Sequence, residues 1–261
     1  MLFLLKITLT PILVALVSLA ARRWGPTFGG LIMGLPWMTG PILFFLGLDH
    51  GEAFVADVAV GALLGTVGLA TFAFTFSTVA RRAAWPVSLL FGFLAYCIVG
   101  YALSGYGLSL WVAAAMGALA LATSYMLITP LPDSDGPRGL PWWDIPVRML
   151  ATAALIVIIT LSVDFLGPEL SGVASTYPVI LTVIGTFTHA RWGAGPVVAL
   201  MRGVALSLQS FVAFFTVLGA TVESLGLITS FIVSSVVALI FSAVFVWWTQ
   251  RARVKKKPKT Q

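Results

Sequence analysis

The chain has 261 residues, of which 59% are hydrophobic and only 9% are charged, with a mean hydropathy of +1.04. A soluble domain is about half apolar and about a quarter charged, so this composition excludes a soluble globular fold. The formal charge of +6 does not predict nucleic-acid binding, because six of the fifteen basic residues lie between Arg251 and Lys259, directly after the last apolar run.

Apolar segments close to the ~20 residues that a helix needs to cross a bilayer follow one another along the chain. They lie at Leu4–Ala20, Gly30–Leu48, Ala53–Val79, Trp85–Leu103, Leu108–Ile128, Ile145–Val163, Leu170–Phe187, Gly195–Ala220 and Gly226–Trp248. We therefore expect an all-α integral membrane protein of about nine transmembrane helices. The first segment has features of a signal peptide, but its counterpart in the second half favours a transmembrane helix.

The basic residues between these segments predict the orientation of the chain. They fall in alternate loops, at Arg22, Arg23, Arg81, Arg82, Arg138 and Arg191, whereas the other loops hold Asp49, Glu52, Glu169 and Glu223. Lys and Arg concentrate on the cytoplasmic side, so we expect an outer N-terminus and a cytoplasmic C-terminus. The expected location is the cell's inner membrane, with the Arg251–Lys259 tail bound to anionic lipid headgroups.

A gapless internal repeat relates the two halves of the chain. Gly25, Pro26, Gly30 and Pro36 recur as the same residue types at Gly167, Pro168, Gly172 and Pro178. The difference in residue number, which we call the repeat offset, is the same for all four pairs (167 − 25 = 142). Agreement at Gly and Pro is informative because both residues constrain backbone geometry. The first four helices therefore correspond to the last four, with the fifth as a connector.

A single transmembrane helix between the two repeats reverses the orientation of the second repeat in the membrane. We therefore expect an inverted 4+1+4 repeat. The expected parts are residues 1–104 as the first repeat, 105–144 as the connector helix with a Pro-rich cytoplasmic loop, 145–249 as the second repeat, and 250–261 as a basic tail. Inverted repeats are a recurring architecture of secondary transporters. The alternative is a duplication that only builds a stable bundle.

The second half resembles the small GlpM-type bacterial membrane proteins of four helices. The residues that carry the resemblance are Ser171-Gly172, Tyr177-Pro178, His189 and Arg202. The resemblance covers mainly the last four helices and implies an inner-membrane location, but no biochemical activity. The first half departs from the pattern, because Leu35 stands before Pro36 and its third helix has no arginine.

The second and seventh helices contain the candidate binding residues. Each proline frees a backbone carbonyl, which is tolerated at membrane depth where it is buried in protein or lines a wet cavity. We expect the segments Gly34–Pro41 and Tyr177–Thr186 to face each other around a central site. The candidates are Gly34, Pro36, Thr39, Gly40, Pro41, Tyr177, Pro178, Thr182 and Thr186. Alternatively, these prolines only kink the helices.

Three further polar residues lie within apolar segments, at Asp57, Arg202 and Gln209. Ionisable groups inside a membrane are costly and are candidates for function. The alternatives are an interfacial position for Asp57 and Arg202 and an interhelical hydrogen bond for Gln209. Arg148 and Lys6 correspond under the repeat, and interfacial anchoring explains both.

No catalytic motif, metal-binding cluster or cofactor motif occurs in the sequence, so we expect no enzyme and no cofactor. His50 and His189 fall on opposite sides of the membrane, and Cys97 is the single cysteine. The leading hypothesis is a small secondary transporter or permease for a neutral, amphipathic or lipid-like substrate, working by alternating access. The alternative is a membrane scaffold or accessory subunit of an envelope-assembly complex. A homo-oligomer is compatible with either hypothesis.

Overall fold

We describe the fold from a computed structural model of the chain. The structure describes residues 2–25, 28, 33–34, 36, 39–103, 105–131, 143–175 and 177–256. Within these ranges the secondary structure is helical, without strands. The helices are α1 (Leu2–Trp24), α3 (Thr39–His50), α4 (Glu52–Val79), α5 (Trp85–Leu103), α6 (Leu110–Leu127), α7 (Asp144–Ser175), α8 (Val179–Trp192), α9 (Ala194–Leu225) and α10 (Leu227–Lys256).

Five stretches in the described part of the chain are long and apolar enough to cross a membrane. They are Glu52–Val79, Trp85–Leu103, Leu110–Leu127, Ala194–Leu225 and Leu227–Trp247. Their outer surfaces carry large exposed apolar side chains such as Leu90, Phe91, Ile240 and Phe241, which lipid solvates and water does not. The chain is therefore a helical membrane protein, as its composition predicts.

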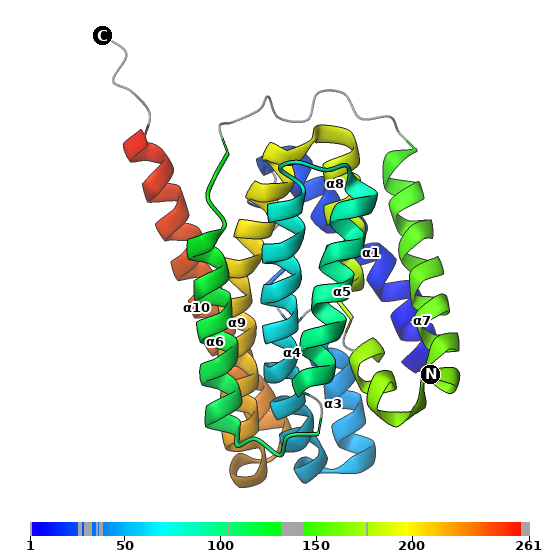
Figure 1. The fold of residues 1–261 in the computed structure, drawn as a ribbon. Helices are drawn as coiled ribbons and strands as arrows, with labels where there is room; N and C mark the ends of the chain where they lie inside the picture. Colours follow the sequence, from blue (N-terminus) through cyan, green and yellow to red (C-terminus); the bar gives the residue numbers. More distant parts are fainter. Residues whose placement is uncertain are drawn as a thin grey trace.

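The centre of the bundle is formed by α4 and α9, and α6 packs against both. α4 packs against α5, α6 and α9, and α9 packs in addition against α10. α4 and α9 lie side by side and run in opposite directions (Figure 1). Small buried residues on these helices, including Gly68, Gly92, Ser210 and Ser234, allow the backbones to approach closely.

A second group of helices, α1, α7 and α8, packs beside the central bundle. α1 and α7 contact each other over much of their length and run in opposite directions (Figure 1). Both helices also contact α8. The end of α1, the start of α7 and the end of α8 are thereby brought together.

Two helices are too short to cross a bilayer. α3 has 12 residues and α8 has 14, which corresponds to about 18 Å and about 21 Å of helix, against a hydrocarbon core of about 30 Å. α3 occupies the lower end of the bundle in Figure 1 and α8 the upper end. Each ends at a glycine with positive φ, Gly51 at 86° and Gly193 at 77°, a conformation that side chains with a Cβ rarely adopt.

The boundaries of the broken helices differ from those expected. The second helix is expected from Gly30, but α3 begins only at Thr39, and residues 29–32, 35, 37 and 38 lie outside the described part. The sixth and seventh helices are expected to separate near Gly167-Pro168, but α7 is continuous to Ser175. A proline removes one backbone hydrogen bond and can bend a helix without ending it, so the break comes later, before Pro178.

Candidate functional site

A proline precedes each of the two short helices: Pro178 lies directly before α8, and Pro36 lies three residues before α3. The carbonyl oxygen of Pro36 accepts a hydrogen bond from the backbone N–H of Gly40, and that of Pro178 accepts one from Thr182, both at 2.9 Å. Pro178 is the N-cap of α8, and the carbonyl oxygen of Pro36 accepts the corresponding bond from the second residue of α3. The interruption that Pro178 predicts is present between α7 and α8, and the one at Pro36 stays a prediction, because most residues before α3 lie outside the described part.

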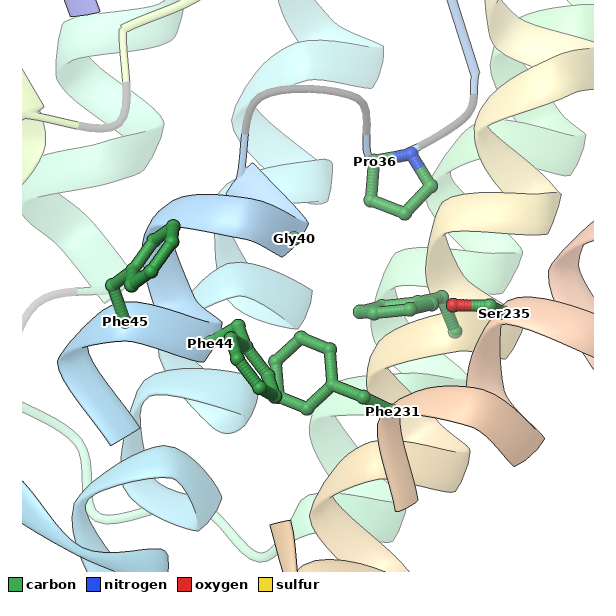
Figure 2. A pocket seen from close by; sticks show the side chains of 7 residues that line it. Pro36, Gly40, Phe44, Phe45, Phe231 and Ser235 are labelled. Carbon is green, nitrogen blue, oxygen red and sulfur yellow. The ribbon is translucent and has the colours of Figure 1, made fainter. Parts of the chain in front are cut away.

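A pocket of about 270 Å³ lies next to Pro36, between α3, α9 and α10. Its lining is mainly aromatic and carries no charged residue (Figure 2): Pro36, Gly40, Phe44, Phe45, Phe214, Phe231 and Ser235. The rings of Phe44 and Phe231 meet edge to face with centroids 5.2 Å apart, and those of Phe214 and Phe231 are 5.8 Å apart. Such a lining suits an apolar ligand with few polar groups.

Tyr177, before Pro178, lies among aromatic side chains of α4 and α5. Its ring centroid is 5.4 Å from that of Tyr96, 5.5 Å from Phe93 and 6.4 Å from Phe72, all in edge-to-face geometry. Its hydroxyl oxygen accepts a hydrogen bond from Thr182 Oγ1 at 2.8 Å. Tyr177 therefore contacts both Thr182 and the first half of the chain.

The two predicted segments pack against opposite halves of the chain. Pro36 and Gly40 face α9 and α10, whereas Tyr177 contacts α4 and α5. The pocket at Pro36 and the surroundings of Tyr177 are thus two environments among the described residues. Met33, beside Gly34, packs on the same buried cluster as Val183 and Ile184 of the second segment, and one central site between the segments stays a prediction.

The other predicted binding residues lie near these two environments. Gly34 packs so closely on α9 that a Cβ would come within 2.4 Å of three Ser207 atoms, which makes glycine obligatory there. Thr39 and Pro41 lie in the first turn of α3. The Thr186 hydroxyl in α8 is buried and has no hydrogen-bond partner among the described residues.

The three polar residues predicted within apolar segments have different surroundings. Asp57 is exposed on α4, close to the start of that helix, as an interfacial residue would be. Gln209 donates to the carbonyl oxygen of Ala118 at 2.9 Å, which confirms the expected interhelical hydrogen bond. Arg202 donates to the carbonyl oxygens of Tyr125 and Ile128 and lies 4.0 Å from the Tyr125 ring centroid. It therefore binds the C-terminal end of α6, where cations are favoured.

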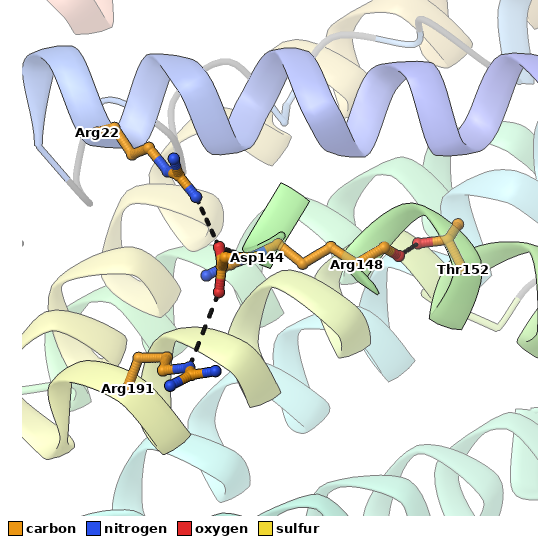
Figure 3. Close-up of polar contacts among 5 residues, drawn as sticks. All are labelled: Arg22, Asp144, Arg148, Thr152 and Arg191. Carbon is orange, nitrogen blue, oxygen red and sulfur yellow. Dashed lines mark hydrogen bonds and ion pairs between the residues drawn. The ribbon is translucent and has the colours of Figure 1, made fainter. Parts of the chain in front are cut away.

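A buried ion cluster, which the sequence analysis missed, joins α1, α7 and α8 (Figure 3). Asp144 Oδ2 lies 2.8 Å from both Arg22 Nη2 and Arg148 Nε, and Asp144 Oδ1 lies 3.9 Å from Arg191 Nε. Asp144 is 0% exposed and Arg148 is 1% exposed. Removing such charges from water is costly unless they are paired, so the cluster constrains the ends of these three helices.

The structure corrects the expectation for Arg148. Interfacial anchoring does not describe a buried guanidinium that also lies 5.1 Å from the ring centroid of Phe187 and 5.7 Å from that of Trp192. The available signal was the spacing of Asp144 and Arg148, an acid and a base one helical turn apart at the start of an apolar run. The partners Arg22 and Arg191 come from other helices and give no such local signal.

Comparison with known proteins identifies no relative. No family model, no curated protein and no solved structure matches this chain.

Proposed function

We propose that this protein is a small secondary transporter for a neutral, amphipathic substrate, built from an inverted repeat and working by alternating access. The observation that carries the proposal is the pair of short helices α3 and α8. Each begins after a proline, within the bundle, and the two prolines, Pro36 and Pro178, are related by the repeat offset. Discontinuous helices at corresponding places in two halves mark the substrate site in many transporters.

The positions of the helix starts support the repeat. α4 begins at Glu52 and α9 at Ala194, which are related by the repeat offset. The same offset relates the starts of α5 and α10, and those of α1 and α7. The members of the pairs α1/α7 and α4/α9 run in opposite directions (Figure 1), as an inverted repeat requires. α4 packs against α5, and their counterparts α9 and α10 likewise pack against each other.

The lining of the pocket supports a substrate without net charge. Its aromatic side chains and the single hydroxyl of Ser235 provide apolar surface and one polar group. A charged substrate would need a compensating charge in such surroundings. The charged clusters lie elsewhere, at the ends of helices.

The orientation follows from the positive-inside rule, with the Asp144 cluster and the C-terminal end of α10 on the cytoplasmic side. Arg251 lies 3.8 Å from the Trp247 ring centroid at the end of α10, a pairing suited to the headgroup region. Residues 257–261 of the basic tail lie outside the described part. Anionic lipid headgroups are the proposed partners of this tail.

The test uses a matched pair of cysteines in a Cys97→Ala background, Gly40→Cys and Thr182→Cys, at positions that the repeat offset relates. Gly40 has room for a side chain, since its nearest contact for a Cβ is 3.8 Å away. Each variant is labelled with a membrane-impermeant thiol reagent, in right-side-out and in inside-out membrane vesicles. Leu94→Cys, on the exposed face of α5, is the lipid-facing control.

Transport predicts that both positions react, and that each is reached from both faces of the membrane as the protein changes conformation. A scaffold with a dry core predicts no reaction at either position. Reaction from one face only at both positions would also contradict alternating access.

A further inference from the structure

The residues that line the pocket have counterparts in the other half of the chain. Under the repeat offset, Pro36 corresponds to Pro178 and Gly40 to Thr182, while Phe214 on α9 corresponds to Phe72 on α4. Ser235 on α10 corresponds to Phe93 on α5. Three of these counterparts, Thr182, Phe72 and Phe93, are direct contacts of Tyr177.

The Tyr177 side chain thus fills the position in the second half that is open in the first. The two environments differ in side-chain size. The open pocket has Gly40 and Ser235 where the filled one has Thr182 and Phe93, whereas Phe44 and Phe231 of the open pocket correspond to the smaller Thr186 and Leu89. The residue that corresponds to Tyr177 is Leu35, which lies outside the described residues.

We propose that the substrate site is a pair of equivalent pockets, that Tyr177 occupies the second pocket as an internal ligand, and that the substrate is a small molecule with a planar ring and one hydrogen-bonding end. The proposal rests on the repeat and the transport function proposed above. It goes beyond them by assigning a second pocket, its present occupant and a class of substrate.

The chemistry of the substrate follows from the surroundings of Tyr177. Its ring meets three aromatic rings edge to face, the arrangement that the aromatic quadrupole favours, and its hydroxyl is bound by Thr182. The open pocket likewise offers Phe44, Phe214 and Phe231, with the Ser235 hydroxyl at its edge. A free molecule with the same features would fit both pockets.

The volume of the open pocket is compatible with this class of ligand. An engineered cavity of about 150 Å³ lined by apolar side chains binds benzene, so about 270 Å³ admits a ring with a substituent. A long acyl chain would extend beyond a space of this size. The Tyr177 side chain as a free molecule, p-cresol, is therefore the appropriate probe.

The single native cysteine provides a reporter for the second pocket. Cys97 is partly buried on α5 and directly follows Tyr96, whose ring contacts that of Tyr177. Replacing Tyr177 by Ala vacates the second pocket and should raise the rate at which Cys97 reacts with a small thiol reagent at least tenfold. Tyr177→Phe keeps the ring and should leave the rate within twofold of that of the native chain.

Millimolar p-cresol should then return the Cys97 rate of Tyr177→Ala close to the native value. n-Hexanol, which partitions into membranes but has no ring, is the matched control and should not protect. If Tyr177→Ala does not fold, Tyr177→Leu is used to vacate the second pocket instead. Leucine is the residue at the corresponding position of the first half, Leu35. Each labelling rate is normalised to the amount of cysteine that reacts after the protein is unfolded in SDS.

The open pocket is probed with Ser235→Cys in a Cys97→Ala background. We expect p-cresol to slow its labelling, and not that of Leu239→Cys, an exposed position one turn further along α10. Equal protection by p-cresol and n-hexanol would overturn the planar-ring class. Unchanged Cys97 labelling in both the Ala and the Leu variant of Tyr177 would overturn the second pocket, even with position 235 protected.

These results are independent of the two-sided labelling proposed above. Protection at position 235 and in Tyr177→Ala establishes a pair of ring-binding pockets, even if positions 40 and 182 react from one face only. In that case the proposal of paired pockets is supported and the proposal of transport is rejected. The reverse result, alternating exposure without protection, retains transport and rejects the paired pockets.

Discussion

The Asp144 carboxylate and the Arg148 guanidinium form a buried ion pair one helical turn apart at the start of α7, with Oδ2 and Nε separated by 2.8 Å. Arg22 of α1 shares the same carboxylate oxygen at 2.8 Å. One acid thus binds two arginines from two helices, with Arg191 of α8 nearby. The pair holds together the helix ends at one side of the bundle, because neither charge has water to solvate it.

We predict that Asp144→Asn is strongly destabilising, because it leaves Arg148 as a buried and unpaired cation. Breaking a buried pair by removing one partner typically costs about 3–5 kcal/mol. Unfolding of the purified protein by SDS titration, followed by circular dichroism, measures the change. Asp57→Asn, at an exposed position of α4, is the control and should change the free energy of unfolding by less than about 0.5 kcal/mol.

A double variant, Asp144→Leu with Arg148→Leu, tests whether the penalty comes from the unpaired charge. We expect it to be less destabilised than the sum of the two single variants, since both buried charges are removed together. Equal losses for Asp144→Asn and Asp57→Asn would contradict a structural role for the cluster.

Much of the fold could be predicted from the sequence, because the bilayer imposes simple rules on composition and helix length. The helical membrane character, the start of α4 near residue 52 and the start of α5 at Trp85 followed from apolar runs bounded by charge and glycine. The interruption between α7 and α8 followed from Pro178. The length of α7 did not, because Gly167 and Pro168 can lie inside a bent helix as well as in a loop.

The candidate site was predicted only in part, for a physical reason. The repeat offset identifies equivalent positions but not their neighbours, so Tyr177 could not be assigned to the rings of Phe72 and Phe93. Contacts between the two halves depend on how the helices pack against one another. The local sequence pattern predicts the helices but does not specify this packing. For the same reason Arg22 and Arg191 were expected to be ordinary loop arginines.

The close packing of α4 against α6 predicts a large effect of Gly117→Ala. A Cβ at Gly117 would lie 2.3 Å from Thr66 Oγ1 and 3.0 Å from the Leu63 carbonyl oxygen, so the helices would have to separate. Overpacking of this kind typically costs about 1–3 kcal/mol. Gly61→Ala on α4 is the matched control, because no atom lies within 4 Å of its Cβ position. We expect the control to be neutral or up to about 1 kcal/mol stabilising in the same SDS titration, and equal losses at both glycines would contradict the packing argument.

Arg202 is predicted to stabilise the fold rather than to bind substrate. Its guanidinium donates to two carbonyl oxygens at the end of α6, and hydrogen bonds to charged groups contribute about 1.5–3 kcal/mol. Arg202→Met should therefore lower the free energy of unfolding by that amount, whereas Arg202→Lys should lose less. Protection of position 235 by p-cresol should be unchanged in both variants. Loss of protection in a variant of native stability would instead assign Arg202 to the binding site.

The inverted orientation of the two halves predicts opposite accessibility for equivalent exposed residues. Arg82, after α4, and Ser224, at the end of α9, are both exposed and are related by the repeat offset. In a Cys97→Ala background, Arg82→Cys should react with an impermeant thiol reagent only in inside-out vesicles, and Ser224→Cys only in right-side-out vesicles. The reason is that the cytoplasmic face carries the loop arginines, and an odd connector places the corresponding loop of the second half outside. Labelling of both positions from the same face would contradict the inverted repeat and, with it, the equivalence of the two pockets.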